Sequence, residues 1–248
     1  YYLFDKSHIG NVVFTECYAD NRNVAARPLF EEGLDIIISM NCLVSILDKV
    51  RTANGFVSMT TITSGRNAFG IVGKKSELDK ISTEKPFDGA IEVRCAYEKI
   101  RYTKRENITK NINVIDKYKV FTSKGNGGAG ILSDDKPVAI LGKAYIGYPQ
   151  SVCTDSLIPI GAFDTQSEAE NLQKYMSGKF FRFMVGILKV SQNVSQNVYQ
   201  FVPLQDFTTK SDIDWSKSVP EIDSQIYAKY GLTEEEISYI EEKIKPME

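Results

Sequence analysis

The chain has 248 residues, of which 42% are hydrophobic and 25% are charged, and its 30 basic and 32 acidic residues leave a net charge of −2. This composition is that of an ordinary globular protein, which argues against an intrinsically disordered chain and against a uniformly basic nucleic-acid binder. The longest apolar stretch, residues 33–50, contains Asp, Asn and Ser, so it falls short of the uninterrupted apolar span that a membrane helix needs.

The N-terminal part is predicted to contain a hairpin and one long helix. Strand-like segments at residues 1–5 and 11–16 flank a turn at 7–10, which is typical of a β-hairpin. Apolar side chains then recur at helical spacing over residues 34–53. The chain opens with Tyr1 and no basic segment precedes an apolar run, so we expect no signal peptide and a segment of a longer protein.

The middle of the chain is predicted to be rich in β-strands. Residues 56–165 alternate short runs of β-branched and aromatic residues with loops that contain Gly, Asn and Lys. We expect strands at 56–61, 90–94, 99–103, 118–123, 151–153 and 157–160.

The C-terminal part is predicted to be mainly helical. Short polar residues at 164–167 can cap a helix that covers 168–175, and Gly178 separates this helix from a second one at 179–190. The remaining expected elements are a strand at 198–202 and a last helix, which starts with a capping box formed by Thr233 and Glu236.

Opposite charges gather in two parts of the sequence. Between Arg94 and Lys124 there are nine basic and three acidic residues, whereas residues 205–248 contain eleven acidic residues and five Lys. A surface formed by the first segment would suit phosphate, while the acidic segment would face elsewhere. The alternative is that both segments are ordinary solvated surface.

Residue types that usually bind metals or catalyse hydrolysis form no pattern. Cys17, Cys42, Cys95 and Cys153 are scattered without a C-x-x-C pair, so we expect reduced thiols, no metal site and a cytoplasmic protein. The single histidine, His8, falls in the first predicted turn and is expected to be a surface residue. The metal-dependent nuclease pattern, Pro-Asp followed by Glu/Asp-x-Lys, is also absent.

Residues 125–130 read G-N-G-G-A-G, which fits the glycine pattern of dinucleotide-binding loops. That use requires a helix directly after the last glycine, but residues 131–137 show no helical pattern and end in Pro137. We therefore interpret the run as a glycine loop and expect no cofactor site there. The Asp/Asn-Pro-Pro-aromatic motif that holds a target adenine is missing too, since no two of the eight prolines are adjacent.

Two polar segments carry side chains that suit base edges. An Asn or Gln amide matches the major-groove edge of adenine, and Arg matches guanine. Residues 63–67 (TSGRN) and 189–199 (KVSQNVSQNVY) hold such side chains between predicted elements, with a plain turn or hydrophilic loop as the alternative. The candidate base contacts are Arg66, Asn67, Gln192, Asn193, Gln196 and Asn197, and the candidate phosphate contacts are Lys99, Arg101, Lys104, Arg105, Lys124 and Lys189.

Several segments together are similar to the C-terminal portion of type II, type IIG-like, restriction-modification adenine methyltransferases. The likeness is carried by residues 151–155, 160–163, 168–176, 179–183, 199–207 and 227–247. It implies an α+β fold, in which a β-rich mixed-sheet domain with a long N-terminal helix and C-terminal helices resembles the target-recognition domains of type I specificity subunits.

The resemblance also implies a division of labour. Residues 1–30 would end a methyltransferase domain, 31–207 would recognise double-stranded DNA, and 208–248 would form a connector and an acidic helical tail. Because catalytic and donor-binding motifs have no counterpart here, a covalently linked methyltransferase domain would bind S-adenosylmethionine and perform the chemistry. The alternatives are a module that docks a partner subunit through the acidic tail and residues 180–183, and a small-molecule enzyme that uses the glycine loop.

Overall fold

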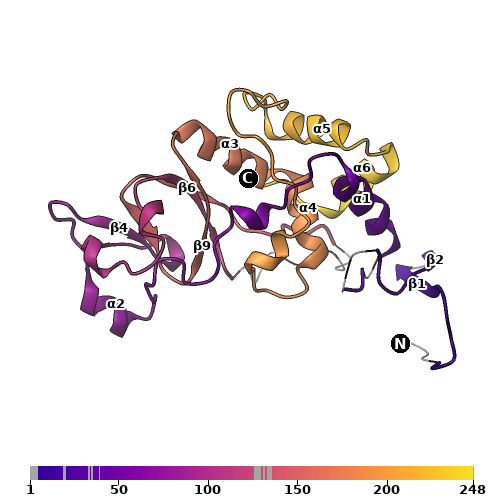
Figure 1. The fold of residues 1–248 in the computed structure, drawn as a ribbon, viewed down its shortest axis with the longest axis horizontal. Helices are drawn as coiled ribbons and strands as arrows, with labels where there is room; N and C mark the ends of the chain where they lie inside the picture. Colours follow the sequence, from indigo (N-terminus) through magenta and orange to yellow (C-terminus); the bar gives the residue numbers. More distant parts are fainter. Residues whose placement is uncertain are drawn as a thin grey trace.

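The computed structural model describes residues 5–247 apart from 19, 20, 33, 35, 39, 126–129, 131 and 133–135. Figure 1 shows an elongated α+β molecule with small sheets at one end, the larger helices at the other, and an N-terminal hairpin that projects beyond them. Within the described residues, no helix is both long and apolar enough to cross a membrane.

The described strands form three sheets. The N-terminal hairpin pairs β1 (Val12–Tyr18) with β2 (Asn21–Arg27). The second sheet has the order β3–β5–β4–β8 and the third the order β7–β6–β9, and only β4 and β8 run parallel. The strands of these two sheets are β3 (Ser82–Thr83), β4 (Ile91–Arg94), β5 (Ile100–Thr103), β6 (Tyr118–Ser123), β7 (Tyr145–Gly147), β8 (Ser151–Cys153) and β9 (Leu157–Phe163).

The helices pack mostly at the other end of the molecule. Helix α2 is the exception, because it lies beside the four-stranded sheet (Figure 1). The α-helices of the described chain are α1 (Asn41–Thr52), α2 (Lys75–Ile81), α3 (Gln166–Ser177), α4 (Lys179–Leu188), α5 (Val219–Lys229) and α6 (Glu234–Lys243).

Helix α4 lies in the middle of the main hydrophobic core. All of its residues from Phe180 to Ile187 are buried, and all of them except Arg182 are apolar, so this stretch of the helix has no face toward solvent. It is packed against α3, α5 and α6, and the rings of Phe181 and Tyr175 meet edge to face at 4.8 Å. A second, smaller core lies under the four-stranded sheet and includes Val93 and Phe121.

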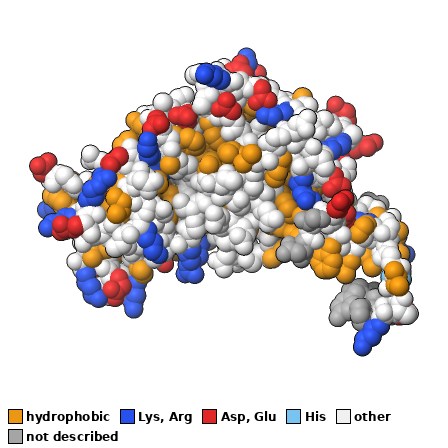
Figure 2. All heavy atoms as spheres, viewed as in Figure 1, with side chains coloured by type: hydrophobic (Ala, Val, Ile, Leu, Met, Phe, Trp, Pro, Cys, Tyr) orange, Lys and Arg blue, Asp and Glu red, His pale blue; other side chains and the backbone are white. Residues whose placement is uncertain are grey.

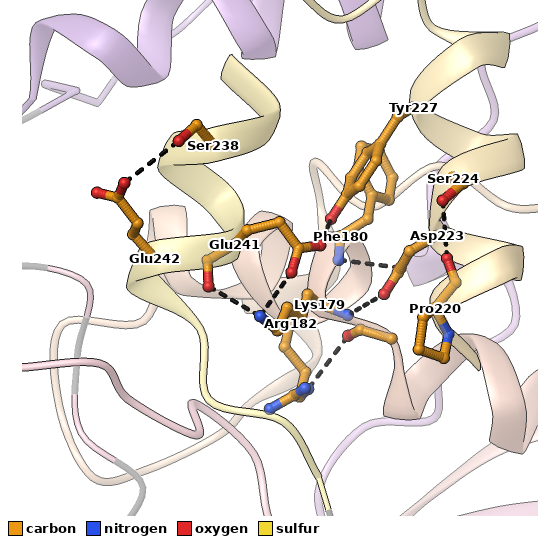
Figure 3. A network of polar contacts seen from close by, with 11 residues as sticks. Lys179, Phe180, Arg182, Pro220, Asp223, Ser224, Tyr227, Ser238, Glu241 and Glu242 are labelled. Carbon is orange, nitrogen blue, oxygen red and sulfur yellow. Dashed lines mark hydrogen bonds and ion pairs between the residues drawn. The ribbon is translucent and has the colours of Figure 1, made fainter. Parts of the chain in front are cut away.

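A buried carboxylate of α5 holds the start of α4 (Figure 3). Asp223 accepts hydrogen bonds from the backbone N–H groups of Lys179 and Phe180, at 2.7 and 3.2 Å. These two N–H groups have no partner within α4, because they belong to its first turn. The contact therefore satisfies the helix N-terminus and joins α5 to the core.

Two further polar side chains, Arg182 and Glu241, make contacts around α4. Arg182, which is 1% exposed, donates from Nε to the carbonyl of Gly178 at 3.1 Å and from a terminal nitrogen to Ala139 O at 3.2 Å. Glu241 of α6 pairs with Lys179 Nζ at 2.6 Å and accepts from the Tyr227 hydroxyl at 2.9 Å (Figure 3). Helices α5 and α6 thus share the main core with α4.

Several predicted elements are confirmed. β6 and β8 have the predicted bounds, and Gly178 separates two helices. Thr165, within the predicted polar residues 164–167, caps α3, and the predicted capping box at Thr233 starts α6.

The N-terminal elements differ in part from the prediction. The partner of the strand at 11–16 is β2, which follows it, while residues 1–4 of the predicted first strand lie outside the described residues. The predicted helix 34–53 begins only at Asn41, because Met40 has an extended backbone and the described residues before it are not helical.

Two predicted strands are 3₁₀ turns instead. The segment 56–61 ends in the turn Met59–Thr61, and the segment 198–202 begins within the turn Gln196–Tyr199. In the second case Val198, Tyr199, Phe201 and Val202 are all buried in the main core, although the run does not pair as a strand, because a short apolar run alone does not determine the backbone conformation. Helices α2 and α5 and strands β3 and β7 were not predicted.

We expect Phe181→Ala to lower the free energy of unfolding by about 3–5 kcal/mol, because the ring is fully buried against Tyr175. Urea denaturation measures this loss. Phe87→Ala, at an aromatic residue that is 40% exposed, serves as control and should cost less than about 1 kcal/mol. Equal losses in the two variants would contradict the central position of α4.

Asp223 should make stability depend on pH. Burial raises the pKa of its carboxyl from 3.8 to about 6, although the backbone donors and Arg182 lower it. Between roughly pH 4 and pH 6 the folded protein therefore holds a proton that the unfolded chain has released, so this contribution to stability is lost as pH rises through that window. Relative to Asp223→Asn, the wild type should lose on the order of 3 kcal/mol. Parallel urea titrations of both proteins at several pH values would refute this if their difference stayed constant.

Candidate nucleic-acid interface

A cavity of about 590 Å³ lies where the turn after β4, the end of β6 and the segment before β7 meet. Lys124 and Lys143 line it together with the amide-bearing Asn193. The aromatic side chains of Tyr97 and Tyr145 also contribute to its wall. Cations, an amide and aromatic rings are therefore gathered around one hollow.

Backbone pairing places Asn193 at this cavity. Val194 N donates to Lys124 O at 2.7 Å, and Gly125 and Asn193 form an antiparallel bridge. Helix α4 ends at Leu188, which packs against the core. The segment after it therefore lies beside the end of β6. Two predicted contacts, Lys124 and Asn193, are thus brought together from segments about 70 residues apart.

The two polar segments singled out in the sequence also meet. Gln196 Nε2 donates to the carbonyl oxygens of Thr60 and Thr63, at 3.1 and 2.7 Å. The segment that contains Thr63 is held in turn along β9, because Ser64 N donates to Pro159 O at 3.0 Å. Gln196 therefore joins the segments, but its amide nitrogen is already used and we leave it out of the proposed base contacts.

The other candidate base contacts differ in exposure. Arg66, Gln192, Asn193 and Asn197 are exposed and can reach a ligand. Asn67 has a left-handed backbone with φ of 56°, which Asn tolerates better than most residues, and its Oδ1 is buried without a hydrogen-bond partner in the described part of the chain. Its amide does not present both of its groups to solvent, so we leave Asn67 out as well.

Three of the six predicted phosphate contacts, Arg101, Lys104 and Arg105, pair with carboxylates. Arg101 pairs with Asp79 at 2.9 Å, lies 3.8 Å from Glu84 and has a side chain that is only 14% exposed. Arg105 forms a bidentate salt bridge with Asp116, with nitrogen–oxygen distances of 3.0 and 2.5 Å. These contacts orient each guanidinium toward the protein.

The lysines are divided between surface and core. Lys189 is 2% exposed and its ammonium donates to Gly130 O at 2.7 Å, so it is not accessible to a phosphate. Lys104 lies 3.6 Å from Glu106 on the surface, and Lys99 is exposed. Of the predicted set, Lys99 and Lys124 remain without an ion-pair partner among the described residues. Figure 2 shows this interleaving, since red acidic side chains stand among the blue ones at the sheet end of the molecule.

Sequence reasoning missed Lys143, Tyr97 and Tyr145. Lys143 lies outside the basic segment and in no motif, so no sequence signal marks it. Tyr97 lies in the turn between two correctly predicted strands, where an aromatic residue is the only hint. The Tyr145 hydroxyl donates to Glu98 Oε1 at 2.7 Å, and this hydrogen bond raises the pKa of Tyr145.

Other predicted features lie elsewhere. In the glycine run, residues 126–129 fall outside the described residues. His8 is exposed as predicted, Cys42 and Cys95 are half-buried and Cys153 is buried, with no disulfide among these three. Where the structure describes the chain, no group of three or more His, Cys, Asp or Glu could hold a metal ion.

Comparison with known proteins does not indicate what the cavity binds. The chain matches no protein-family model and no curated protein. What the site binds is therefore inferred from its own residues.

The contacts described above predict different effects on stability for substitutions of Gln196 and Asn193. Gln196→Ala should lower the free energy of unfolding by about 1–3 kcal/mol, because two backbone carbonyls lose their donor. Asn193→Ala should change it by less than about 0.5 kcal/mol, because that side chain is exposed. Urea denaturation of both variants tests the assignment, and a larger loss in Asn193→Ala would reverse it.

Proposed function

We propose that this protein recognises a DNA sequence on behalf of a restriction-modification N6-adenine methyltransferase. In this proposal the protein docks on double-stranded DNA in the cytoplasm, and a covalently linked domain binds S-adenosylmethionine and transfers the methyl group. The recognition fold would resemble the target-recognition domains of type I specificity subunits.

The observation that carries the proposal is the direct backbone pairing of Lys124 with the Asn193 segment at the rim of the cavity. Phosphate contacts from Lys fix the position of a protein on DNA, whereas an Asn amide can read a base edge. Lys124 and Lys143 are cations with no carboxylate partner among the described residues, and they lie beside that amide. The arrangement thus combines a positioning charge with a reading group. The proposed base contacts are Arg66, Gln192, Asn193 and Asn197, and the proposed phosphate contacts are Lys99, Lys124 and Lys143.

The N-terminal hairpin supports the idea of an attached domain. Phe14 and Arg27 face each other on one side of the hairpin, with the guanidinium 3.5 Å from the ring centre. On the other side, Val13 and Val24 are 69% and 50% exposed, and Figure 2 shows hydrophobic side chains on this projecting end. A two-stranded hairpin is marginally stable by itself, so a neighbour that covers these valines would stabilise it.

A protein-docking module is the second candidate, and the same exposed hairpin favours it. The contact expected from the sequence, residues 180–183, cannot serve, because these residues are buried in the main core. Salt separates the two candidates, since DNA binding weakens steeply with the logarithm of the salt concentration and an apolar protein interface does not.

We expect duplex binding to depend on Lys124 and Lys143. Fluorescence anisotropy with a labelled random-sequence duplex, measured over a range of KCl concentrations, gives the slope of log affinity against log salt. Lys124→Ala/Lys143→Ala should reduce the magnitude of this slope by about 2, because each lost phosphate contact removes about 0.9.

Arg105→Ala is the matched control, because this exposed cation belongs to the basic segment but is paired with Asp116. It should keep the wild-type slope. Salt-independent binding by the wild type, or an unchanged slope in the double variant, would contradict the proposed interface.

A further inference from the structure

The turn between β4 and β5 has an unfavourable backbone conformation and places the aromatic ring of Tyr97 at the cavity. Tyr97 and Glu98 have φ values of 57° and 59°, and Lys99 N donates to Ala96 O across them. Two successive residues with positive φ are typical of a type I′ hairpin turn, where Asn-Gly is the favoured pair. A Tyr and a Glu in these positions cost about 1–2 kcal/mol each, and such strain is concentrated at functional sites.

The side chain of Tyr97 gains no packing that would offset this cost. The residue is 94% exposed, although it lines the cavity. The neighbouring Glu98 is fixed by the Tyr145 hydroxyl at 2.7 Å, which joins the turn to the opposite segment of the wall. The turn therefore holds an uncovered aromatic ring at the cavity mouth.

The chemistry of the cavity matches the parts of a nucleotide. Its volume of about 590 Å³ falls within the usual range of small-molecule sites, about 300–1,000 Å³. Aromatic side chains stack on nucleobases, an Asn amide can pair with a base edge, and Lys suits a phosphate. Tyr97, Asn193 and the pair Lys124 and Lys143 supply these three functions around one space.

We propose that this cavity is a nucleotide-binding site in which Tyr97 stacks on the base, Asn193 contacts the base edge, and Lys124 and Lys143 contact the phosphate. The nucleotide is either one that has been extruded from a duplex or a free mononucleotide. The first source rests on the proposed function, whereas the second does not.

Two titrations distinguish the sources. The first compares a duplex that contains one mismatched pair with the fully paired duplex of otherwise equal sequence, because a mismatched base costs less to extrude. The second is calorimetry with free 5′-mononucleotides. If the nucleotide comes from DNA, the wild type should bind the mismatched duplex about tenfold more tightly, which corresponds to roughly 1.4 kcal/mol. If it is free, calorimetry should show saturable binding of a mononucleotide.

Tyr97→Gly is the decisive variant, because glycine adopts a positive φ without strain and the turn should stay folded. It should abolish the mismatch preference or the mononucleotide binding, whereas Tyr97→Phe should retain it. Tyr148→Ala, which removes a tyrosine that is 49% exposed and does not line the cavity, should behave as wild type.

The proposal is overturned if the wild type shows neither a mismatch preference nor mononucleotide binding, or if Tyr97→Gly retains whichever signal is seen. A salt-dependent affinity for paired duplex that persists in either case would leave the proposed DNA recognition intact. The two proposals therefore fail separately.

Discussion

The candidate site depends on the burial of helix α4. Because residues 180–187 of this helix are all buried and Asp223 holds its first turn, the helix is fixed in the core, and its end determines where residues 191–197 leave it. The backbone bond from Val194 N to Lys124 O then joins that segment to the end of β6. A cation from the β-rich part and an amide from the helical part meet through this bond, so the cavity belongs to the junction of the two.

Charge pairing decides which cations can serve a ligand. The excess of basic residues between Arg94 and Lys124 is partly cancelled in the fold. Asp79, Glu92 and Asp164, which lie outside this segment, pair with Arg101, Arg94 and Lys117, and Asp116 pairs with Arg105 within it. Lys119, also in this segment, is buried and donates to three backbone carbonyls, and burial lowers its pKa to about 8. What remains at the cavity is a small number of lysines, which is consistent with a protein whose net charge is −2.

The sequence predicted the fold where local chemistry is decisive. β6 and β8 follow from runs of β-formers, and the capping boxes at Thr165 and Thr233 fix two helix starts because the hydrogen bonds are made within four residues. Helix α5 was not predicted, although its Pro220 stands in the first turn, where proline is favoured.

The site was predicted less completely, since the partners of Arg101, Gln196 and Lys189 are distant in sequence and only folding shows them. Lys124 and Asn193 were proposed from the chemistry of their side chains, but the sequence could not predict that they are neighbours. The most direct test of DNA recognition is selection of bound duplexes from a randomised pool. The account predicts that the pool converges on one short sequence with the wild type and loses its preference at one base pair with Asn193→Ala. A pool that stays random, or that is not retained at low salt, would contradict it.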